Sequence, residues 1–213
     1  MITIEQIAPM VRQEHMVRIV LSDETVIKTR DYVAADLGLY PGQELDGDAL
    51  ARLKAAAGKA SAKERAVRII SAAGVSKQEL EHRLTQKGED PGDAREAVAW
   101  LSDLELLDDR KTAEQLVASA VRKGYGRSRI KQILYEKRIP REYWEEALAR
   151  IPDMEDAVDK FLQQRFRGRE PDQKERKRAI DALMRRGYGW QEIQRGLERY
   201  GVTMDAQWEE PYE

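Results

Sequence analysis

The sequence predicts a mainly α-helical protein, with three tandem three-helix repeats in an elongated, curved array after a small N-terminal unit that holds a β-hairpin and a helix. The composition supports this class, because 36% charged and 41% hydrophobic residues are typical of helices that each bury one narrow face. From residue 61 onward, apolar residues recur at the i, i+3, i+4 spacing of helices. Related patterns return along the chain, which indicates a repeat architecture.

Residues 1–60 are expected to form the N-terminal unit. Residues 16–30 alternate apolar and polar side chains around Ser22–Glu24, which predicts two strands joined by a tight turn. Apolar residues between Ile2 and Ile7 can supply a neighbouring strand, and a short helix should begin near Asp48. Because a lone hairpin is only marginally stable in water, this unit is expected to pack on the helices that follow.

Three glycines, Gly74, Gly124 and Gly187, mark the predicted repeats. Each has apolar residues six and ten positions after it, and seven and four positions before it. This agreement predicts a helix, turn, helix unit that recurs along the chain. The expected units are 61–107, 108–151 and 152–201 for the three repeats, followed by an acidic C-terminal tail over 202–213.

Start signals divide each repeat into three helices. Ser76 and Glu79 form an S-x-x-E capping pattern, and the acids that begin at Asp108 favour a helix start in the second repeat. Pro140 suits the first turn of a third helix, while Asp172 opens the second helix of the last repeat.

Charge is unevenly distributed along the chain, although the net formal charge is only −2. Residues 109–150 carry +5 and residues 151–186 carry +2, whereas residues 187–213 carry −4 and the N-terminal segments are also acidic. A basic middle favours an anionic partner, and the acidic tail is a potential competitor for the same surface.

The densest basic stretch, residues 121–141, holds eight Lys or Arg and one acid. A helix is expected to begin at Arg127, and at about 100° per residue Arg127, Lys131 and Arg138 fall on one flank of its apolar stripe. This basic ridge could contact a polyanion or an acidic protein groove. The alternative interpretation is a solvated helix face.

Catalytic and metal-binding groups are scarce. The chain has no cysteine, and His15 and His82 lie far apart, which argues against thiolate zinc sites and His-based catalysis. The adjacent Asp108 and Asp109 are better explained as a helix cap than as an acid pair. We therefore expect no enzyme activity, cofactor or metal. Because the chain has neither a cleavable apolar run at its start nor a stretch long enough to span a membrane, we expect a cytoplasmic protein. We also expect it to be a monomer.

Several stretches together resemble the RecX family, bacterial regulators of the RecA recombinase: VRIVLSDETVIKT, LGLYPGQELD, LSDLELLDDRKTAEQLVASAVRKGYGRSRIKQILYEKRI and LMRRGYGWQEIQRGL. The likeness covers about residues 15–200 and is most specific over 104–139. Two local departures stand out: Asp23 is followed by Glu24 where the family often has Gly, and Thr112 replaces a Phe before Ala113.

The resemblance implies a crescent of three-helix repeats lying in the helical groove of the RecA filament on DNA. Family members mostly inhibit filament extension, ATP hydrolysis and strand exchange, and no catalytic residues are assigned to them. The chain is thus expected to be a non-enzymatic regulator of RecA recombinase, ATPase and coprotease activity. The expected partners are the RecA filament and, through direct contact, single- or double-stranded DNA. The alternative is a stand-alone nucleic-acid-binding protein with helix-turn-helix-like repeats.

The candidate contact residues are basic side chains of the second and third repeats together with the tyrosines of two Gly-Tyr-Gly turns. Either tyrosine could stack on a base or fill a protein pocket, but a structural role in stapling the turn is favoured. The arginines near residue 165 could instead reflect the ordinary preference of helix ends for cations. The predicted set is Arg122, Lys123, Tyr125, Arg127, Arg129, Lys131, Arg138, Arg165, Arg167, Arg185, Arg186 and Tyr188.

Overall fold

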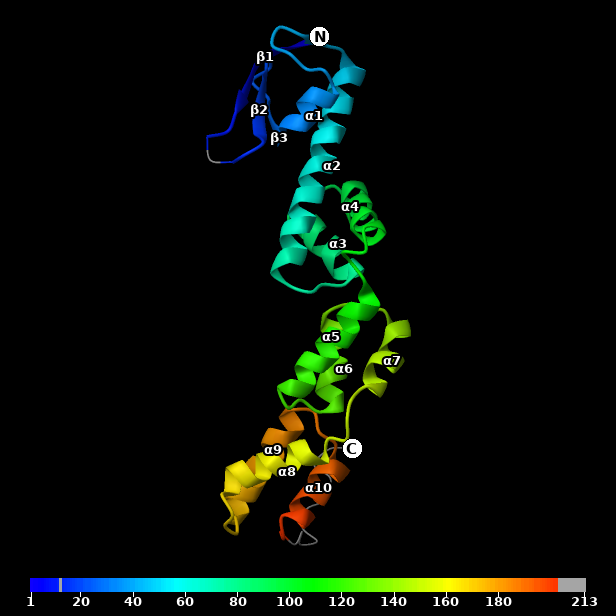
Figure 1. The fold of residues 1–213 in the computed structure, drawn as a ribbon. Helices are drawn as coiled ribbons and strands as arrows, with labels where there is room; N and C mark the ends of the chain where they lie inside the picture. The colour runs from blue at the N-terminus through cyan, green and yellow to red at the C-terminus, as the bar shows by residue number, and fades with distance from the viewer. Residues whose placement is uncertain (12, 203–213) are drawn as a thin grey trace. The chain divides into compact units, whose positions relative to one another are not determined.

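A computed structural model describes residues 1–11 and 13–202 of the chain (Figure 1). The chain divides into two compact units, residues 1–107 and 108–213, which are described separately below as the N-terminal and C-terminal units. Within the described residues, the strands belong to the N-terminal unit and all other regular elements are helical. The predicted acidic tail lies outside the described residues from position 203 onward.

The N-terminal unit begins with a four-stranded sheet in the order β3-β2-β1-β4. The predicted hairpin is present and pairs Val20 with Val26, and in its turn the Asp23 carboxylate accepts a hydrogen bond from the Thr25 amide at 3.0 Å. The apolar residues near the N-terminus form a full strand against this hairpin, so the sheet is larger than the hairpin alone. Its strands are β1 (Ile2–Pro9), β2 (Met16–Leu21), β3 (Val26–Arg30) and β4 (Glu44–Leu45).

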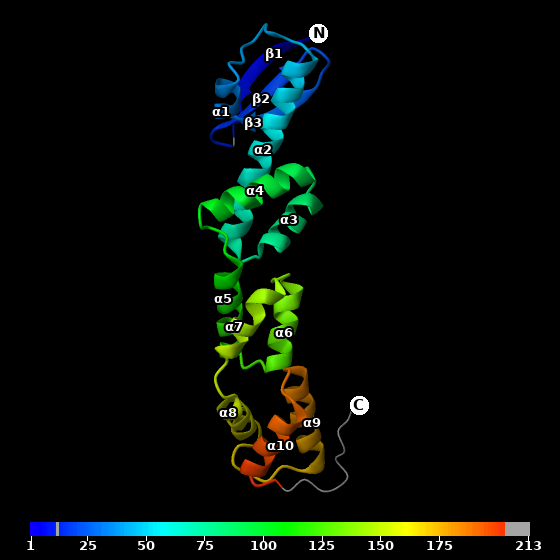
Figure 2. The ribbon, with the colours of Figure 1, turned by 90° about the vertical axis from the view of Figure 1, so that its right-hand side faces the viewer.

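The helix expected near Asp48 is much longer than predicted. Helix α1 (Asp31–Asp36) is followed by α2 (Gly47–Ala72), which has 26 residues and is capped by Asp46, whose side chain accepts from the Ala49 amide at 2.7 Å. Its first half buries Leu53 against the sheet, and its second half belongs to the core of the first repeat. The boundary expected after residue 60 therefore falls inside one continuous helix (Figure 2).

The first repeat consists of the second half of α2 with α3 (Lys77–Gln86) and α4 (Pro91–Asp103). As the capping pattern predicts, the Ser76 hydroxyl accepts a hydrogen bond from the Glu79 amide at 3.0 Å at the start of α3. Pro91 occupies the first turn of α4, where its missing N–H costs nothing. The repeat encloses a core of small and branched apolar residues that includes Leu80, Leu84, Ala97 and Leu101.

The C-terminal unit holds the second and third repeats. Ile130 and Leu134 are fully buried in the core of the second repeat, and Val158, Leu162 and Leu183 in that of the third. The second repeat comprises α5 (Asp109–Arg122), α6 (Arg127–Glu136), the short 3₁₀ helix η1 (Arg141–Tyr143) and α7 (Trp144–Ala149); the third comprises α8 (Glu155–Phe166), α9 (Gln173–Arg185) and α10 (Trp190–Arg199).

The glycine register predicted for the repeats is wrong at its third member. Gly74 and Gly124 lie between the first and second helices of their repeats, whereas Gly187 lies between the second and third helices of the last repeat. The equivalent of Gly124 is instead Gly168, between α8 and α9. The error has a physical cause, because both kinds of helix end favour a glycine in the left-handed conformation, with φ of 70° at Gly124 and 87° at Gly187.

Candidate functional site

The two Gly-Tyr-Gly turns of the sequence meet within the C-terminal unit and join its two repeats. The amide of Gly126 donates a hydrogen bond to the carbonyl oxygen of Arg186 at 2.8 Å. The amide of Ser128 donates to the carbonyl oxygen of Gly187 at 3.1 Å. Backbone of one repeat is thus hydrogen-bonded directly to backbone of the next, and we call this contact the turn junction.

Glycine is required at two positions of the turn junction. A Cβ atom at Gly126 would lie 2.4 Å from the carbonyl oxygen of Gly187. A Cβ atom at Gly187 would lie 2.3 Å from the backbone nitrogen of Arg129, and Gly187 also has a φ of 87°. Because backbone atoms cannot move aside like the end of a side chain, only glycine permits this close approach.

Tyr188 is part of the turn junction and is not an exposed contact residue. Its side chain is 4% exposed, and its hydroxyl donates to the carbonyl oxygen of Gly124 at 3.1 Å. Burial raises the pKa of Tyr188, which keeps the hydroxyl protonated as a donor. Tyr188 therefore has the structural role that the sequence favoured, and its ring is not exposed to stack on a base in this structure. Tyr125 is half-buried against the core of the second repeat.

A pocket of about 540 Å³ lies beside the turn junction, where α5, α8 and α9 approach one another. The end of α5 and the residues after it supply one wall, α8 supplies another, and the residue after α9 completes the pocket. Its lining contains several cations and no carboxylate. We call this site the basic pocket and define it by its cationic residues: Arg122, Lys123, Lys160, Arg165 and Arg186.

The five cations of the basic pocket line one hollow that no carboxylate lines. None of them forms an ion pair with an acid in the part of the chain that the structure describes. In the N-terminal unit, by contrast, Lys59 and Lys63 share Glu96, and Arg65 pairs with Glu89 at 2.5 Å. The basic pocket therefore presents cations that no ion pair neutralises, although Arg165 also acts at longer range on the carboxylate of Glu175.

Helix geometry explains part of this charge but not all of it. Arg122 and Arg186 lie at the C-terminal ends of α5 and α9, where the helix dipole favours cations. The dipole of each helix places only about half a negative charge at its C-terminal end, whereas each Lys or Arg of the pocket carries a full positive charge. Arg186 also lies over the ring of Phe161, with 5.0 Å between its guanidinium carbon and the ring centroid. This cation–π contact holds one guanidinium at the pocket wall.

The ridge predicted on α6 is present only in part. Arg127 and Lys131 are exposed and lie one helical turn apart, as expected. Arg138 does not continue the ridge, because α6 ends at Glu136 and Arg138 has a left-handed φ of 52°. Arg129 is partly buried and pairs with Glu136 at 3.2 Å.

Two further predicted arginines lie outside the basic pocket. Arg167 ends α8 in the left-handed conformation, with a φ of 54°, and Arg185 is the last residue of α9. Both are exposed, and neither lines the pocket. Of the predicted residues, the structure gathers four: Arg122, Lys123, Arg165 and Arg186.

Lys160 is the pocket residue that sequence reasoning missed. It follows the acids Glu155, Asp156 and Asp159 in α8, so the sequence around it has a negative net charge and does not indicate a basic site. The helical spacing carried a usable signal, since Phe161 and Arg165 lie four residues apart on one face of α8 and both line the pocket.

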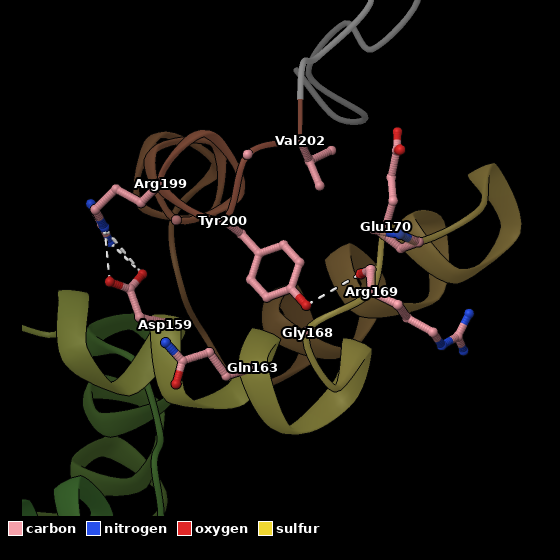
Figure 3. Close-up of a pocket in the computed structure, with 11 residues that line it drawn as sticks. Asp159, Gln163, Gly168, Arg169, Glu170, Arg199, Tyr200 and Val202 are labelled. Carbon is pink, nitrogen blue, oxygen red and sulfur yellow. Dashed lines mark hydrogen bonds and ion pairs between the residues drawn. The ribbon is translucent and has the colours of Figure 1, made fainter.

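A larger cavity of about 640 Å³ in the third repeat is balanced in charge (Figure 3). Arg199 forms a forked pair with Asp159, including a 2.8 Å contact between Nη2 and Oδ1. Tyr200 lies across the cavity and its hydroxyl donates to the carbonyl oxygen of Arg169 at 3.3 Å. Arg169 itself pairs with Glu175. Because its cations already have partners, this cavity attracts a polyanion less than the basic pocket does.

Asp108, the first of the paired acids, is the N-cap of α5, and Asp109 lies in the first turn of the helix. The Asp108 carboxylate accepts a hydrogen bond from the Lys111 amide at 3.1 Å, and this bond holds the pKa of Asp108 below its ordinary value. The cap interpretation is confirmed. Among the described residues there is no group of three or more His, Cys, Asp or Glu arranged to hold a metal ion. Across the same residues, no helix combines the length and apolar character that a bilayer span demands.

Comparisons with known proteins agree on one family. The family description "RecX, second three-helix domain" matches residues 108–148, and "RecX, third three-helix domain" matches residues 153–197. The regulatory protein RecX of Vibrio parahaemolyticus is 32% identical over 139 residues, which cover 64% of this chain and 90% of that protein. The RecX of Chlorobaculum tepidum is 36% identical over 139 residues, or 63% of this chain and 85% of that protein.

Solved structures show the same fold. A crystal structure of regulatory protein RecX aligns with a TM-score of 0.63 at 18% sequence identity, covering 94% of this chain and 99% of that chain. The crystal structure of RecX from Lactobacillus salivarius aligns with a TM-score of 0.59 at 18% identity, covering 68% of this chain and 97% of that chain.

Proposed function

The chain belongs to the RecX family, and on that premise we propose that it is a non-enzymatic regulator that binds the RecA–DNA filament and inhibits its recombinase, ATPase and coprotease activities. The relatives carry the name regulatory protein, which supports a regulatory role. The filament is a polymer of protein and DNA, and the DNA makes part of it strongly anionic.

The observation that carries this proposal is the uncompensated positive charge of the C-terminal unit. Arg127 and Lys131 are exposed on α6, and the basic pocket adds cations that have no acidic partner in the described chain. Such a surface accelerates encounter with an anionic polymer and orients the bound protein. The turn junction joins the second and third repeats, so that cations from both repeats can act on one ligand.

Inhibition follows if the protein binds one state of the filament better than another. Filament growth and ATP hydrolysis require rearrangement of successive subunits, and a ligand with higher affinity for one arrangement shifts the population toward it. A tenfold preference corresponds to about 1.4 kcal/mol, so a modest difference in contacts is sufficient.

The test reverses the two exposed α6 cations and measures RecA ATPase on single-stranded DNA. We expect Arg127→Glu with Lys131→Glu to raise the concentration for half-inhibition by about tenfold or more, because two attractive charges become repulsive. Arg129 is left intact, since it pairs with Glu136 and touches the turn junction.

A matched control reverses Arg52 and Lys54, exposed cations of α2 in the N-terminal unit. It makes the same change in net charge and should leave inhibition close to that of the parent protein. Equal loss in both variants would show a general charge effect and count against the proposed surface.

The alternative function is that of a stand-alone nucleic-acid-binding protein. The basic pocket is the one feature that supports it. Salt titration separates the two functions. A stand-alone binder should bind naked duplex DNA with a steep salt dependence, whereas the regulator should bind RecA filaments much more tightly than the same DNA without RecA.

A further inference from the structure

We infer that the basic pocket is occupied by an acidic segment of the same chain, residues 203–213, which competes there with an anionic partner. The segment carries no Lys or Arg, and its acids are Asp205, Glu209, Glu210 and Glu213. The pocket has five cations in its lining and no carboxylate. Docking of the segment does not depend on the proposed function, whereas its effect on the partner rests on that function.

The segment and the pocket belong to the same unit but start from different sides of α8. Val202, the residue before the segment, lines the larger cavity of the third repeat together with Asp159 and Gln163 of α8 (Figure 3). Phe161 and Gln164 of the same helix line the basic pocket. At about 100° per residue, these two faces of α8 lie roughly 150° apart. A helix with its side chains is about 11 Å across, so a path around half of it is about 17 Å long.

The segment is long enough to follow this path. Because each residue extends a chain by about 3.3 Å, Glu209 can lie about 23 Å from Val202 and Glu210 about 26 Å. Both distances exceed the path around α8. Asp205 can lie only about 10 Å from Val202, which is too short. We therefore assign the contact to Glu209 and Glu210.

Lys160 lies on this path. It projects roughly midway between the two faces of α8, about 75° from each. It is exposed, lines the pocket and forms no ion pair within the described residues. A carboxylate that approaches around α8 meets this ammonium group before it meets the arginines of the pocket, so the route itself is attractive.

The residue before the two acids also suits the pocket. Trp208 precedes Glu209 in the sequence, and an indole ring packs favourably on an arginine guanidinium. The pocket already contains one contact of this kind, because Arg186 lies over the ring of Phe161 at 5.0 Å. The segment thus offers both kinds of group that the lining of the pocket can bind.

Proximity favours this occupant, since the cations themselves accept either carboxylate or phosphate. A tethered segment meets its site at an effective concentration on the order of millimolar, which a separate ligand must reach in solution. If the segment fills the pocket two-thirds of the time, the apparent affinity for a competing anion falls about threefold. Such a device would reserve the pocket for a partner with high charge density.

Paramagnetic relaxation measures the docking directly, because a chain without cysteine accepts a single label. Gln207→Cys places a nitroxide beside the two acids, and amide spectra of the ¹⁵N-labelled full chain are recorded. We expect broadening at Lys123 and Gly124, which line the pocket from the end of α5. At 1 M salt the Debye length is about 3 Å and the broadening should disappear. Absence of broadening in dilute salt overturns the inference.

Two double variants locate the contact. Lys160→Gln with Arg165→Gln removes two pocket cations and should reduce the broadening at least twofold. Lys174→Gln with Lys177→Gln removes two exposed cations of α9 outside the pocket and should leave it unchanged. Equal loss in both variants would show diffuse attraction and overturn the pocket as the docking place. Far-ultraviolet circular dichroism confirms that each variant is folded.

A mixture of two preparations identifies the occupant. One preparation carries ¹⁵N and no nitroxide, and the other carries the nitroxide and no ¹⁵N. A segment that docks in its own chain gives no broadening in this mixture. Broadening as strong as that within one chain would assign the occupant to a second copy and overturn the inference.

Competition is measured by the anisotropy of a fluorescein-labelled 15-mer oligothymidylate, used as a polyanion probe. Glu209→Gln with Glu210→Gln should tighten its binding about threefold. The matched control, Glu145→Gln with Asp181→Asn, removes two exposed acids of the same unit and should tighten binding much less. Equal tightening in both variants would show a general charge effect and overturn the competition.

The outcome is separable from that of the proposed function, because neither measurement contains RecA. If the nitroxide reports docking but the parent protein leaves RecA ATPase unchanged, the docking stands and RecA regulation fails. If the parent inhibits RecA while the nitroxide broadens no signal at Lys123 or Gly124, regulation stands and the inference is overturned.

Discussion

The two Gly-Tyr-Gly turns of the C-terminal unit have the same sequence but different surroundings. Residues 124–126 connect the first two helices of the second repeat, and residues 187–189 connect the last two helices of the third. Tyr125 packs half-buried in its own repeat, whereas Tyr188 is buried and donates to a carbonyl oxygen of the other turn. The role of such a turn is therefore set by the helices it connects and by what faces it.

This difference also explains how the basic pocket forms. If the two turns occupied equivalent places in their repeats, they would be separated by a repeat length. Because they occupy different places, they meet and bring the end of α5 beside the end of α9. Arg122 and Lys123 from one repeat thereby line the same pocket as Arg186 from the next.

The largest effect is expected from the first glycine of each turn. Gly187→Ala places a Cβ against the Arg129 backbone at 2.3 Å with φ at 87°, and should destabilise the C-terminal unit by about 3 kcal/mol or more. Gly124→Ala keeps a similar strained φ but meets only the guanidinium of Arg186 at 3.4 Å, an ordinary contact distance to a side chain, and should cost about 1 kcal/mol. Urea denaturation of the full chain measures both, and equal costs would contradict the comparison.

The third glycine should show the opposite asymmetry between the turns. Gly126→Ala brings a Cβ within 2.4 Å of the Gly187 carbonyl oxygen, whereas Gly189→Ala meets only the Glu192 carboxylate, at the ordinary contact distance of 3.4 Å. We expect a loss of about 2 kcal/mol for the first and under about 0.5 kcal/mol for the second. Thermal melting compares them, and a Gly189 variant less stable than the Gly126 variant would count against the turn junction.

The tyrosines should differ by one hydrogen bond. Tyr188→Phe leaves the carbonyl oxygen of Gly124 without the hydroxyl that donates to it, at a cost of about 1 kcal/mol. Tyr125→Phe should change stability by less than about 0.5 kcal/mol, since the ring and its packing remain. Faster hydrogen exchange of the Gly126 and Ser128 amides should accompany the first substitution and not the second.

The smallest effect is a pH dependence of the C-terminal unit. Burial raises the pKa of Tyr188 above its ordinary value near 10. A group whose pKa is raised on folding contributes stability that is complete below the unfolded-state pKa and is lost as pH rises through the folded-state pKa. The unfolding free energy should therefore fall above about pH 10 in the parent, and Tyr188→Phe should flatten that fall. An identical pH profile in the variant would show that Tyr188 does not titrate in this way.

The sequence was sufficient to predict most helix starts of the fold. Ser76, Asp108 and Asp172 act as N-caps where their side-chain chemistry requires it, and Asp172 forms a complete capping box with Glu175. Periodicity was less informative for α2, because its long alanine-rich stretch lacks a regular apolar stripe, and the helix therefore appeared shorter than it is. The two-residue strand β4 was missed because so short a segment shows no alternation.

The candidate site was predictable in composition but not in arrangement. The sequence indicated Arg122, Lys123, Arg165 and Arg186 as contact residues, and the structure places all four in the lining of one pocket. It could not reveal Lys160, because the sequence does not show that α8 lines the same pocket as the end of α5. Nor could it distinguish Tyr125 from Tyr188, whose local sequences match and whose burial depends on tertiary contacts.

The decisive experiment measures RecA ATPase on single-stranded DNA, titrated with the full chain and with the Arg127→Glu, Lys131→Glu variant. We expect ATP hydrolysis to fall as the parent protein is added, and the variant to need about tenfold more protein for the same effect. An unchanged rate at saturating parent protein, or equal inhibition by parent and variant, would contradict this expectation.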